Sequence, residues 1–206
     1  MKSRQGAAVA HSGAVRALIL ALMLLALPAQ VAAQGRADVM YVPTSPRTVA
    51  AMLALGEVGP GDVLYDLGSG DGRIPIEAAK RFGIRAVGVE IDPERLREAN
   101  ANARAAGVTD LVSFRRQDLF RTDVREATVV TLYLLPDLNL RLRPRLLTEL
   151  RPGARVVSHA FDMGDWTPEK VVDVGDGDRI YLWRIPERPP SPTARSPRPR
   201  PSASPE

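Results

Sequence analysis

The fold of this chain is decided by residues 63–73, which read Val-Leu-Tyr-Asp-Leu-Gly-Ser-Gly-Asp-Gly-Arg. The apolar residues 63–65 predict a short buried strand, residues 66–72 predict a tight glycine-rich turn, and a helix is expected from Arg73 onward. Glycine lets the backbone take positive φ and come close to a ligand. At the carboxyl end of a strand, such a loop is where open α/β sheets bind nucleotides.

The spacing of the glycines separates two classes of nucleotide ligand. A dinucleotide fingerprint has the pattern G-x-G-x-x-G, with a pyrophosphate on the helix N-terminus. Here Gly68, Gly70 and Gly72 alternate behind Asp66, and no lysine follows directly to hold a phosphate. The carboxylates of Asp66 and Asp71 would repel a phosphate and attract an ammonium group. The loop therefore favours S-adenosyl-L-methionine, which carries an amino acid group and a sulfonium. The alternative is a strand-to-helix turn that binds nothing.

Acidic residues also follow the next two expected strands. Residues 85–90 predict an apolar strand that ends in Glu90, about two dozen residues after Asp66. That is near the offset of roughly 20 residues at which an acid binds ribose hydroxyls. Asp118 follows a third strand, expected over residues 111–115. Three consecutive strands therefore each end in a carboxylate at one edge of a sheet, which indicates a shared binding site.

These residues resemble a known family over residues 39–187. The run Asp-Leu-Gly-Ser-Gly-Asp-Gly at 66–72, then Glu90 and Asp118, is similar to the class I S-adenosylmethionine-dependent methyltransferases. The segment Tyr-Val-Pro-Thr at 41–44 ahead of that loop resembles a narrower group, the small protein-lysine methyltransferases. Its mitochondrial members modify the ATP synthase c-subunit and the adenine nucleotide translocase. The resemblance implies an α/β fold: a Rossmann-like, seven-stranded, mostly parallel sheet in the order 3-2-1-4-5-7-6, with helices on both faces and a closing antiparallel hairpin.

The remaining elements follow from local patterns. Ser45-Pro46 and Asp92-Pro93 each combine a capping side chain with a proline at the first helical position, and the second helix is expected to end at Ala106. Strands are expected over residues 127–132 and 155–161, and hairpin strands over 171–174 and 180–185. Between them, a helix over residues 138–150 is expected to bend or break at Pro144.

The resemblance implies a role for each candidate site residue. The hypothesis assigns Asp66, Gly68, Ser69 and Gly70 to the methionine end of the cofactor, Glu90 to the ribose and Asp118 to the adenine. In class I enzymes the loop after the fourth strand lies nearest the transferred methyl group, so Tyr133 and Asp137 are candidates for holding an acceptor amine. The alternatives are core packing for Tyr133 and a helix N-cap for Asp137. This loop departs from the Asn-Pro-Pro-Tyr pattern of enzymes that methylate DNA bases and glutamine, which argues against planar substrates.

Residues 41–44 and His159 carry two open alternatives. The segment 41–44 would cross the mouth of the site, where a hydroxyl could reach the cofactor or acceptor; otherwise it is a turn stiffened by Pro43 and Pro46. His159 lies in an expected strand and is interpreted as a hydrogen-bonded core residue. The one other histidine is His11, so no metal site is expected.

The resemblance implies transfer of a methyl group to a lysine side chain of a protein, with membrane proteins among the candidate substrates. A small-molecule methyltransferase is one alternative. Another is an exported, non-catalytic domain of the same fold that binds a nucleoside or a protein. No nucleic-acid partner is expected, because much of the basic excess lies at the two chain ends, in Lys2, Arg4, Arg16, Arg195, Arg198 and Arg200.

The two ends of the 206-residue chain differ from its centre. Residues 1–33 are typical of a signal peptide, with basic residues, an apolar run at 17–27 and a cleavage site expected after Ala33; a membrane anchor is the alternative. Charge bias puts the following domain, residues 34–187, outside the cytoplasm, in an exported, periplasmic or membrane-anchored form. The side of the membrane stays open, because the methyl donor is made inside cells. Residues 188–206, rich in Pro, Ser and Arg, predict a disordered tail.

Overall fold

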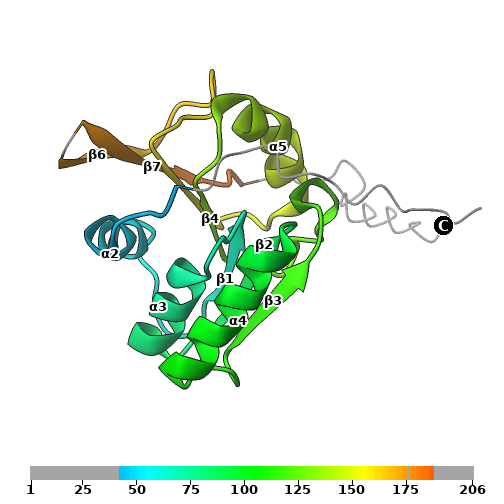
Figure 1. The fold of residues 1–206 in the computed structure, drawn as a ribbon. Helices are drawn as coiled ribbons and strands as arrows, with labels where there is room; N and C mark the ends of the chain where they lie inside the picture. The colour runs from blue at the N-terminus through cyan, green and yellow to red at the C-terminus, as the bar shows by residue number, and fades with distance from the viewer. Residues whose placement is uncertain (1–41, 176, 188–206) are drawn as a thin grey trace, which may run out of the picture. The chain divides into compact units, whose positions relative to one another are not determined.

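The computed structural model describes residues 42–175 and 177–187 (Figure 1). The expected leader over residues 1–33, Tyr41 and the expected tail over residues 188–206 lie outside the described residues. In chain order the described elements are α2 Pro46–Leu55, β1 Val63–Leu67, α3 Arg73–Phe82, β2 Arg85–Glu90, α4 Pro93–Ala106, β3 Val112–Arg116, the 3-10 turn η1 Leu119–Arg121, β4 Val129–Leu132, α5 Pro136–Glu149, β5 Arg155–His159, β6 Lys170–Gly175 and β7 Asp178–Arg184. Within the described residues, no helix has the length and apolar character needed to cross a membrane.

The seven strands form one sheet in the order β3-β2-β1-β4-β5-β7-β6, as the family resemblance implies. Strands β1 to β5 pair in parallel, whereas β7 pairs antiparallel with both β5 and β6. Parallel strands joined by helical crossovers end at the same edge of the sheet. The carboxyl ends of β1, β2 and β4 are therefore neighbours, and they support the glycine-rich loop.

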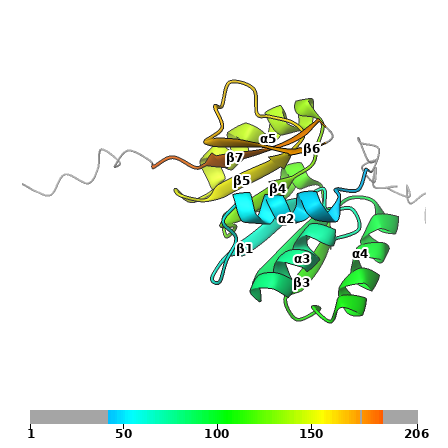
Figure 2. The same ribbon diagram turned by 90° about the vertical axis from the view of Figure 1, so that its left-hand side faces the viewer.

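Helices cover both faces of the sheet (Figure 2). Along β1 the side chains alternate: Leu64 packs in an apolar cluster with residues of α2, α3 and α4, whereas Tyr65 and Leu67 pack in a second cluster with Leu142 and Leu146 of α5. This alternation is the two-residue period of a strand buried on both faces. Asp66 shares the face of Leu64, so its carboxyl group lies on the α2 and α3 side.

The helix starts predicted from side-chain caps are confirmed. Ser45 Oγ accepts a hydrogen bond from the Thr48 amide at 3.1 Å, and the Asp92 carboxylate accepts one from the Glu94 amide at 2.7 Å. Helix α4 ends at Ala106 because Gly107 takes the left-handed conformation, with φ of 69°.

Several predicted boundaries shift. Strand β1 extends to Leu67, β4 begins at Val129, and β5 ends at His159, since Ala160 takes a positive φ of 64°. Helix α5 begins at Pro136 with Leu135 at the N-cap position, so Asp137 lies in the first turn and is not the cap. The helix also continues through Pro144. A proline there removes one backbone hydrogen bond, but the apolar face of α5 stays packed on the sheet and keeps one helix.

Candidate active site

A cavity of about 200 Å³ lies at the carboxyl ends of β1, β2 and β4. Its lining includes six of the eight site residues predicted from the sequence: Asp66, Gly68, Ser69, Glu90, Asp118 and Tyr133. Gly70 lies in the same loop and binds the Glu90 side chain, whereas Asp137 is exposed and is not among the lining residues. The three strand-end carboxylates thus meet at one cavity, as the shared sheet edge predicts.

The glycine loop passes close to its neighbours, and two positions require glycine. Gly68 has φ of 85°, and a Cβ there would come within 2.9 Å of the Leu134 side chain. Gly72 has φ of 81°, and a Cβ there would overlap the Phe114 ring. The amides of Gly68 and Ser69 both donate to the Val89 carbonyl, at 2.9 and 3.0 Å. The loop is therefore fixed against the end of β2 by backbone bonds that a side chain would disturb.

Glu90 organises the loops on either side of it. Its Oε2 accepts a hydrogen bond from the Gly70 amide at 2.9 Å, and its Oε1 accepts from the amides of Ile91 and Asp92 at 2.7 and 2.9 Å. A carboxylate that receives backbone N–H groups makes strong, charge-assisted bonds. Glu90 thus joins the glycine loop to the start of α4 while its carboxylate lines the cavity. The sequence indicated a ribose-binding acid but gave no sign of this structural role.

Asp66 is the most deeply buried acid of the cavity, with 3% of its surface exposed. Burial raises the pKa of its carboxyl group to about 7; a hydrogen bond from the Thr131 hydroxyl, at 2.8 Å, opposes that shift, and the nearby charges of Glu90 and Asp71 add to it. A cationic ligand beside this carboxyl group would favour its ionised form and lower its pKa.

Ser69 lines the cavity, but its hydroxyl is closed off from it. The oxygen has no hydrogen-bond partner within the described residues and lies against Gly88 of β2, 2.7 Å from where a Cβ on that glycine would stand. The three carboxylates and the narrow approach at Gly68 therefore carry the fit to S-adenosylmethionine, whose amino group and sugar hydroxyls donate hydrogen bonds.

An arginine ties the lead-in segment, residues 42–45, to the glycine loop. Arg73 pairs with the Asp71 carboxylate at 2.6 Å and also donates through Nη1 to the Thr44 carbonyl at 2.6 Å. Asn102 of α4 donates to the Asp71 carbonyl at 3.0 Å. The lead-in is therefore held over the cavity, where residues 42–44 form part of the lining. Sequence reasoning missed this contact, because the partner Thr44 lies 29 residues away.

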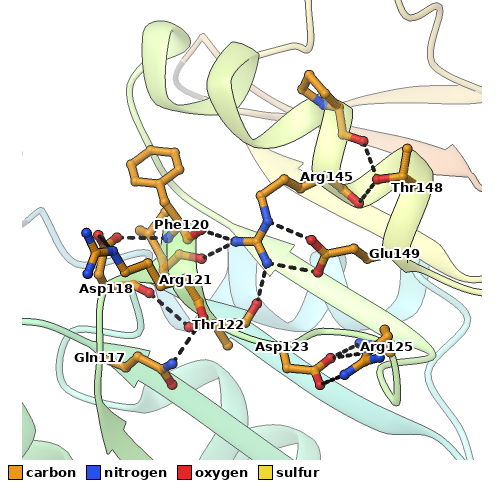
Figure 3. Close-up of polar contacts among 12 residues, drawn as sticks. Gln117, Asp118, Phe120, Arg121, Thr122, Asp123, Arg125, Arg145, Thr148 and Glu149 are labelled. Atoms are coloured by element: carbon orange, nitrogen blue, oxygen red, sulfur yellow. Dashed lines mark hydrogen bonds and ion pairs between the residues drawn. The ribbon is translucent and has the colours of Figure 1, made fainter.

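The loop around Asp118 is fastened to α5 by one guanidinium group (Figure 3). Arg145 donates to the carbonyls of Phe120 and, at 2.8 Å, Thr122, and it pairs with Glu149 at 2.7 Å. Asp118 caps the short η1 turn by accepting from the Phe120 amide at 2.8 Å. Arg145 therefore fixes the backbone that presents Asp118 and Phe120 to the cavity. Sequence reasoning missed Arg145, because its partners are backbone atoms of a distant loop.

Tyr133 forms the cavity wall after β4 and packs on His159. The two ring centroids lie 4.0 Å apart with an interplanar angle of 42°, and the Phe161 ring lies 6.5 Å from Tyr133. Burial first, and the negative charge of Asp178 second, raise the pKa of the Tyr133 phenol, so it stays protonated at neutral pH. Tyr133 thus packs on the buried His159 ring and lines the cavity.

Comparisons with known proteins agree with this geometry. A family model described as the ANTKMT methyltransferase domain matches residues 66–170. A protein-lysine N-methyltransferase of Saccharolobus islandicus is 49% identical over 72% of this chain and 95% of its own length. The adenine nucleotide translocase lysine N-methyltransferase of Mus musculus is 38% identical over 73% of this chain and 65% of its own length.

Solved structures share the same fold. One described as an RNA methyltransferase from Salinibacter ruber, in complex with S-adenosyl-L-homocysteine, is 58% identical, with a TM-score of 0.70 over 72% of this chain and 97% of that one. S-adenosyl-L-homocysteine is the demethylated form of S-adenosylmethionine, in agreement with the ligand that the cavity fits. The chain belongs to the ANTKMT methyltransferase family, and it is an S-adenosylmethionine-dependent methyltransferase of the protein-lysine methyltransferase type.

Proposed function

We propose that this protein methylates the side-chain nitrogen of a lysine in a membrane protein. The observation that carries the proposal is the cavity itself, where three carboxylates and an aromatic wall lie under a lead-in held by Arg73. The relatives named for lysine methylation of the adenine nucleotide translocase and of the ATP synthase c-subunit support this substrate class.

On the cofactor side, we assign Asp66, Gly68, Ser69 and Gly70 to the methionine end, Glu90 to the ribose and Asp118 to the adenine. When bound, S-adenosylmethionine supplies a methyl carbon that its sulfonium makes electrophilic. Asp66 contributes an acceptor whose charge responds to a cation, and Ser69 forms part of the cavity lining. Glu90 keeps the loop in shape while it lines the cavity.

On the acceptor side, the main task of the protein is to align the amine. The Tyr133 ring is fixed by His159, and an aromatic face attracts an ammonium group and also packs against a lysine stem. Asp137 lies in the exposed first turn of α5. That position gives its proposed role in holding the acceptor amine no direct support, and we assign the amine contact to Tyr133 alone.

The description of the Salinibacter ruber relative makes RNA a second candidate substrate. The decisive experiment incubates the full-length protein with labelled S-adenosylmethionine and, in separate reactions, membrane proteins, RNA and a metabolite extract. We expect label in a protein band and methylated lysine in its peptides by mass spectrometry. Label confined to RNA or to small molecules would overturn the proposed substrate.

Membrane association through residues 1–33 is also part of the proposal, and it rests on the sequence pattern alone. A reporter fused behind residue 40 would show which side of the membrane the domain occupies. We expect export or anchoring, with the reporter in the membrane fraction or outside the cytoplasm. A reporter that stays free in the cytoplasm would contradict both the signal peptide and the anchor.

A further inference from the structure

Three polar side chains form a continuous chain from the cavity to the protein surface. Thr44, which lines the cavity, has its hydroxyl 3.3 Å from Nδ1 of His159. His159 Nε2 lies 3.2 Å from the Asp178 carboxylate. Thr44 and His159 are 4% and 3% exposed, whereas the Asp178 side chain is 47% exposed. The three residues come from the lead-in, the end of β5 and the start of β7.

The hydrogen-bond partners determine where the protons lie. An ionised carboxylate can only accept, so Nε2 of His159 carries the hydrogen that it donates to Asp178. In a neutral imidazole the other nitrogen then accepts, and the Thr44 hydroxyl is its donor. The lone pairs of the Thr44 oxygen remain able to accept a hydrogen bond from a donor in the cavity.

The surroundings keep the His159 ring neutral near pH 7. Burial lowers its pKa, and the hydrogen bond with Asp178 opposes that shift. Of the described groups in contact with the ring, Asp178 and Tyr133 can titrate, and Tyr133 stays protonated at neutral pH because its own pKa is raised. A neutral imidazole can accept a proton on one nitrogen and release one from the other.

Lysine methylation, the function proposed above and the basis of this inference, needs such a path. A lysine side chain has a pKa near 10.4, so it arrives as an ammonium group without a lone pair. One N–H bond must break, with its electron pair left on nitrogen, before the amine can attack a methyl carbon. The released proton needs an acceptor, and the Thr44 hydroxyl at the cavity wall, hydrogen-bonded to His159, can serve as one.

We propose that Thr44, His159 and Asp178 carry this proton from the acceptor ammonium to solvent. The ammonium gives its proton to the Thr44 oxygen while the Thr44 hydroxyl proton moves to Nδ1 of His159. The Nε2 proton moves to the Asp178 carboxylate and from there to water. One proton leaves in total, and the imidazole ends in the other tautomer until exchange with solvent restores it. Thr44 contacts the substrate, and His159 and Asp178 act through Thr44.

The alternative is that these bonds only hold the lead-in in place, and substitutions separate the two roles. Thr44→Val keeps the size of the side chain and removes the hydroxyl, whereas Thr44→Ser keeps the hydroxyl. His159→Gln preserves polarity but cannot relay a proton. Thr48→Val is the matched control, because Thr48 is a similarly buried threonine, 5% exposed, whose hydroxyl contacts Ser45 instead.

The experiment measures kcat between pH 6 and pH 10 on a lysine-containing protein substrate, with calorimetric S-adenosylmethionine affinity for every variant. General acid–base groups typically contribute about 10²- to 10⁴-fold. We expect Thr44→Val and His159→Gln to lose at least about tenfold in kcat at pH 7 and to recover as pH approaches the pKa of lysine. Thr44→Ser should restore the pH dependence that Thr44→Val loses, and Thr48→Val should follow the wild-type profile.

Three other results would each contradict the proton path. If wild type methylates lysine and the two variants lose activity by one factor at every pH, or lose none, the proton path is wrong and the proposed function stands. If the variants lose cofactor affinity together with activity, the bonds only hold the lead-in and the path is also wrong. If wild type methylates no lysine at any pH, the proposed function fails and the proton path fails with it.

Discussion

Asp66, a buried carboxyl group at the cavity, is the acidic residue that we assign to the methionine end of the cofactor. It lies at the end of β1, is almost fully buried, and accepts a hydrogen bond from the Thr131 hydroxyl. Its position is costly for a free carboxylate, because burial disfavours the charged form. A cationic ligand would offset this cost, because an opposite charge favours the ionised carboxylate.

The raised pKa of Asp66 makes the stability of the ligand-free protein depend on pH. Its pKa is about 7 in the folded protein and 3.8 as a model group, so the folded state holds the proton more tightly. The stability from this proton is fully present below about pH 3.8 and is lost as pH rises to about 7, at up to about 1.4 kcal/mol per pH unit. Denaturant unfolding of wild type and Asp66→Asn between pH 4 and pH 8 measures this. The asparagine variant should lack this component, and a stability difference that does not change with pH would contradict the assignment.

Gly68 should tolerate no side chain, for two separate reasons. Alanine would be strained at φ of 85°, and its Cβ would press on Leu134 at the cavity wall. Gly83 is the matched control, since it has φ of 64° with nothing within 4 Å of a Cβ. Both alanine variants should lose about 1 to 2 kcal/mol in stability from the left-handed backbone. Gly68→Ala should lose more because of the Leu134 contact, and only Gly68→Ala should also weaken S-adenosylmethionine binding. Equal affinities for the two variants, measured by calorimetry, would show that the close approach at Gly68 is not used by the ligand.

The loop over residues 117–122 depends on α5 for its shape. Arg145→Met keeps most of the aliphatic stem and removes the guanidinium that binds the loop carbonyls. We expect faster hydrogen exchange of the loop amides and weaker cofactor binding, because Asp118 loses its fixed support. Arg125→Met is the control, since Arg125 pairs with the nearby Asp123 on the protein surface (Figure 3). Identical exchange in both variants would mean that Arg145 does not order the loop.

The sequence predicts elements well where the signal is local. Ser45-Pro46 and Asp92-Pro93 give the starts of α2 and α4 correctly, because the capping bond forms within three residues. The start of α5 lacks such a signal: Leu135 caps it without a side-chain bond, and Pro136 opens the helix. The passage through Pro144 depends on tertiary packing, which propensity alone does not encode.

In the candidate site too, some residues could be predicted from the sequence and others could not. The meeting of Asp66, Glu90 and Asp118 was predictable, because parallel strands bring their carboxyl ends to one edge. The side chains that hold these residues were not. Thr131 binds Asp66 across 65 residues of sequence, and His159 meets Thr44 across 115. Such pairs follow from strand register and packing between elements, which leave no periodic pattern in the sequence.

The order of the strands in the sheet explains where the cavity lies. β1 lies between β2 and β4, so the chain crosses over one face to β2 and later returns to the other side of β1. Open α/β sheets bind ligands at this change of direction, outside the carboxyl ends of the strands. Apolar clusters on both faces fix the strands, and the cavity stands between the two sets of crossovers. The strand topology therefore sets the position of the site, and the side chains that line it decide which ligand fits.

We assign cofactor binding to the three strand-end carboxylates that line this cavity. Calorimetric titration of the full-length protein and of Asp66→Asn, Glu90→Gln and Asp118→Asn with S-adenosyl-L-homocysteine measures that dependence. We predict saturable binding of one molecule by wild type, weakened in each variant by about 1 to 3 kcal/mol, the usual cost of an unpaired buried polar group. Wild-type affinity in all three variants, or no binding heat in any protein, would show that these carboxylates do not hold the cofactor.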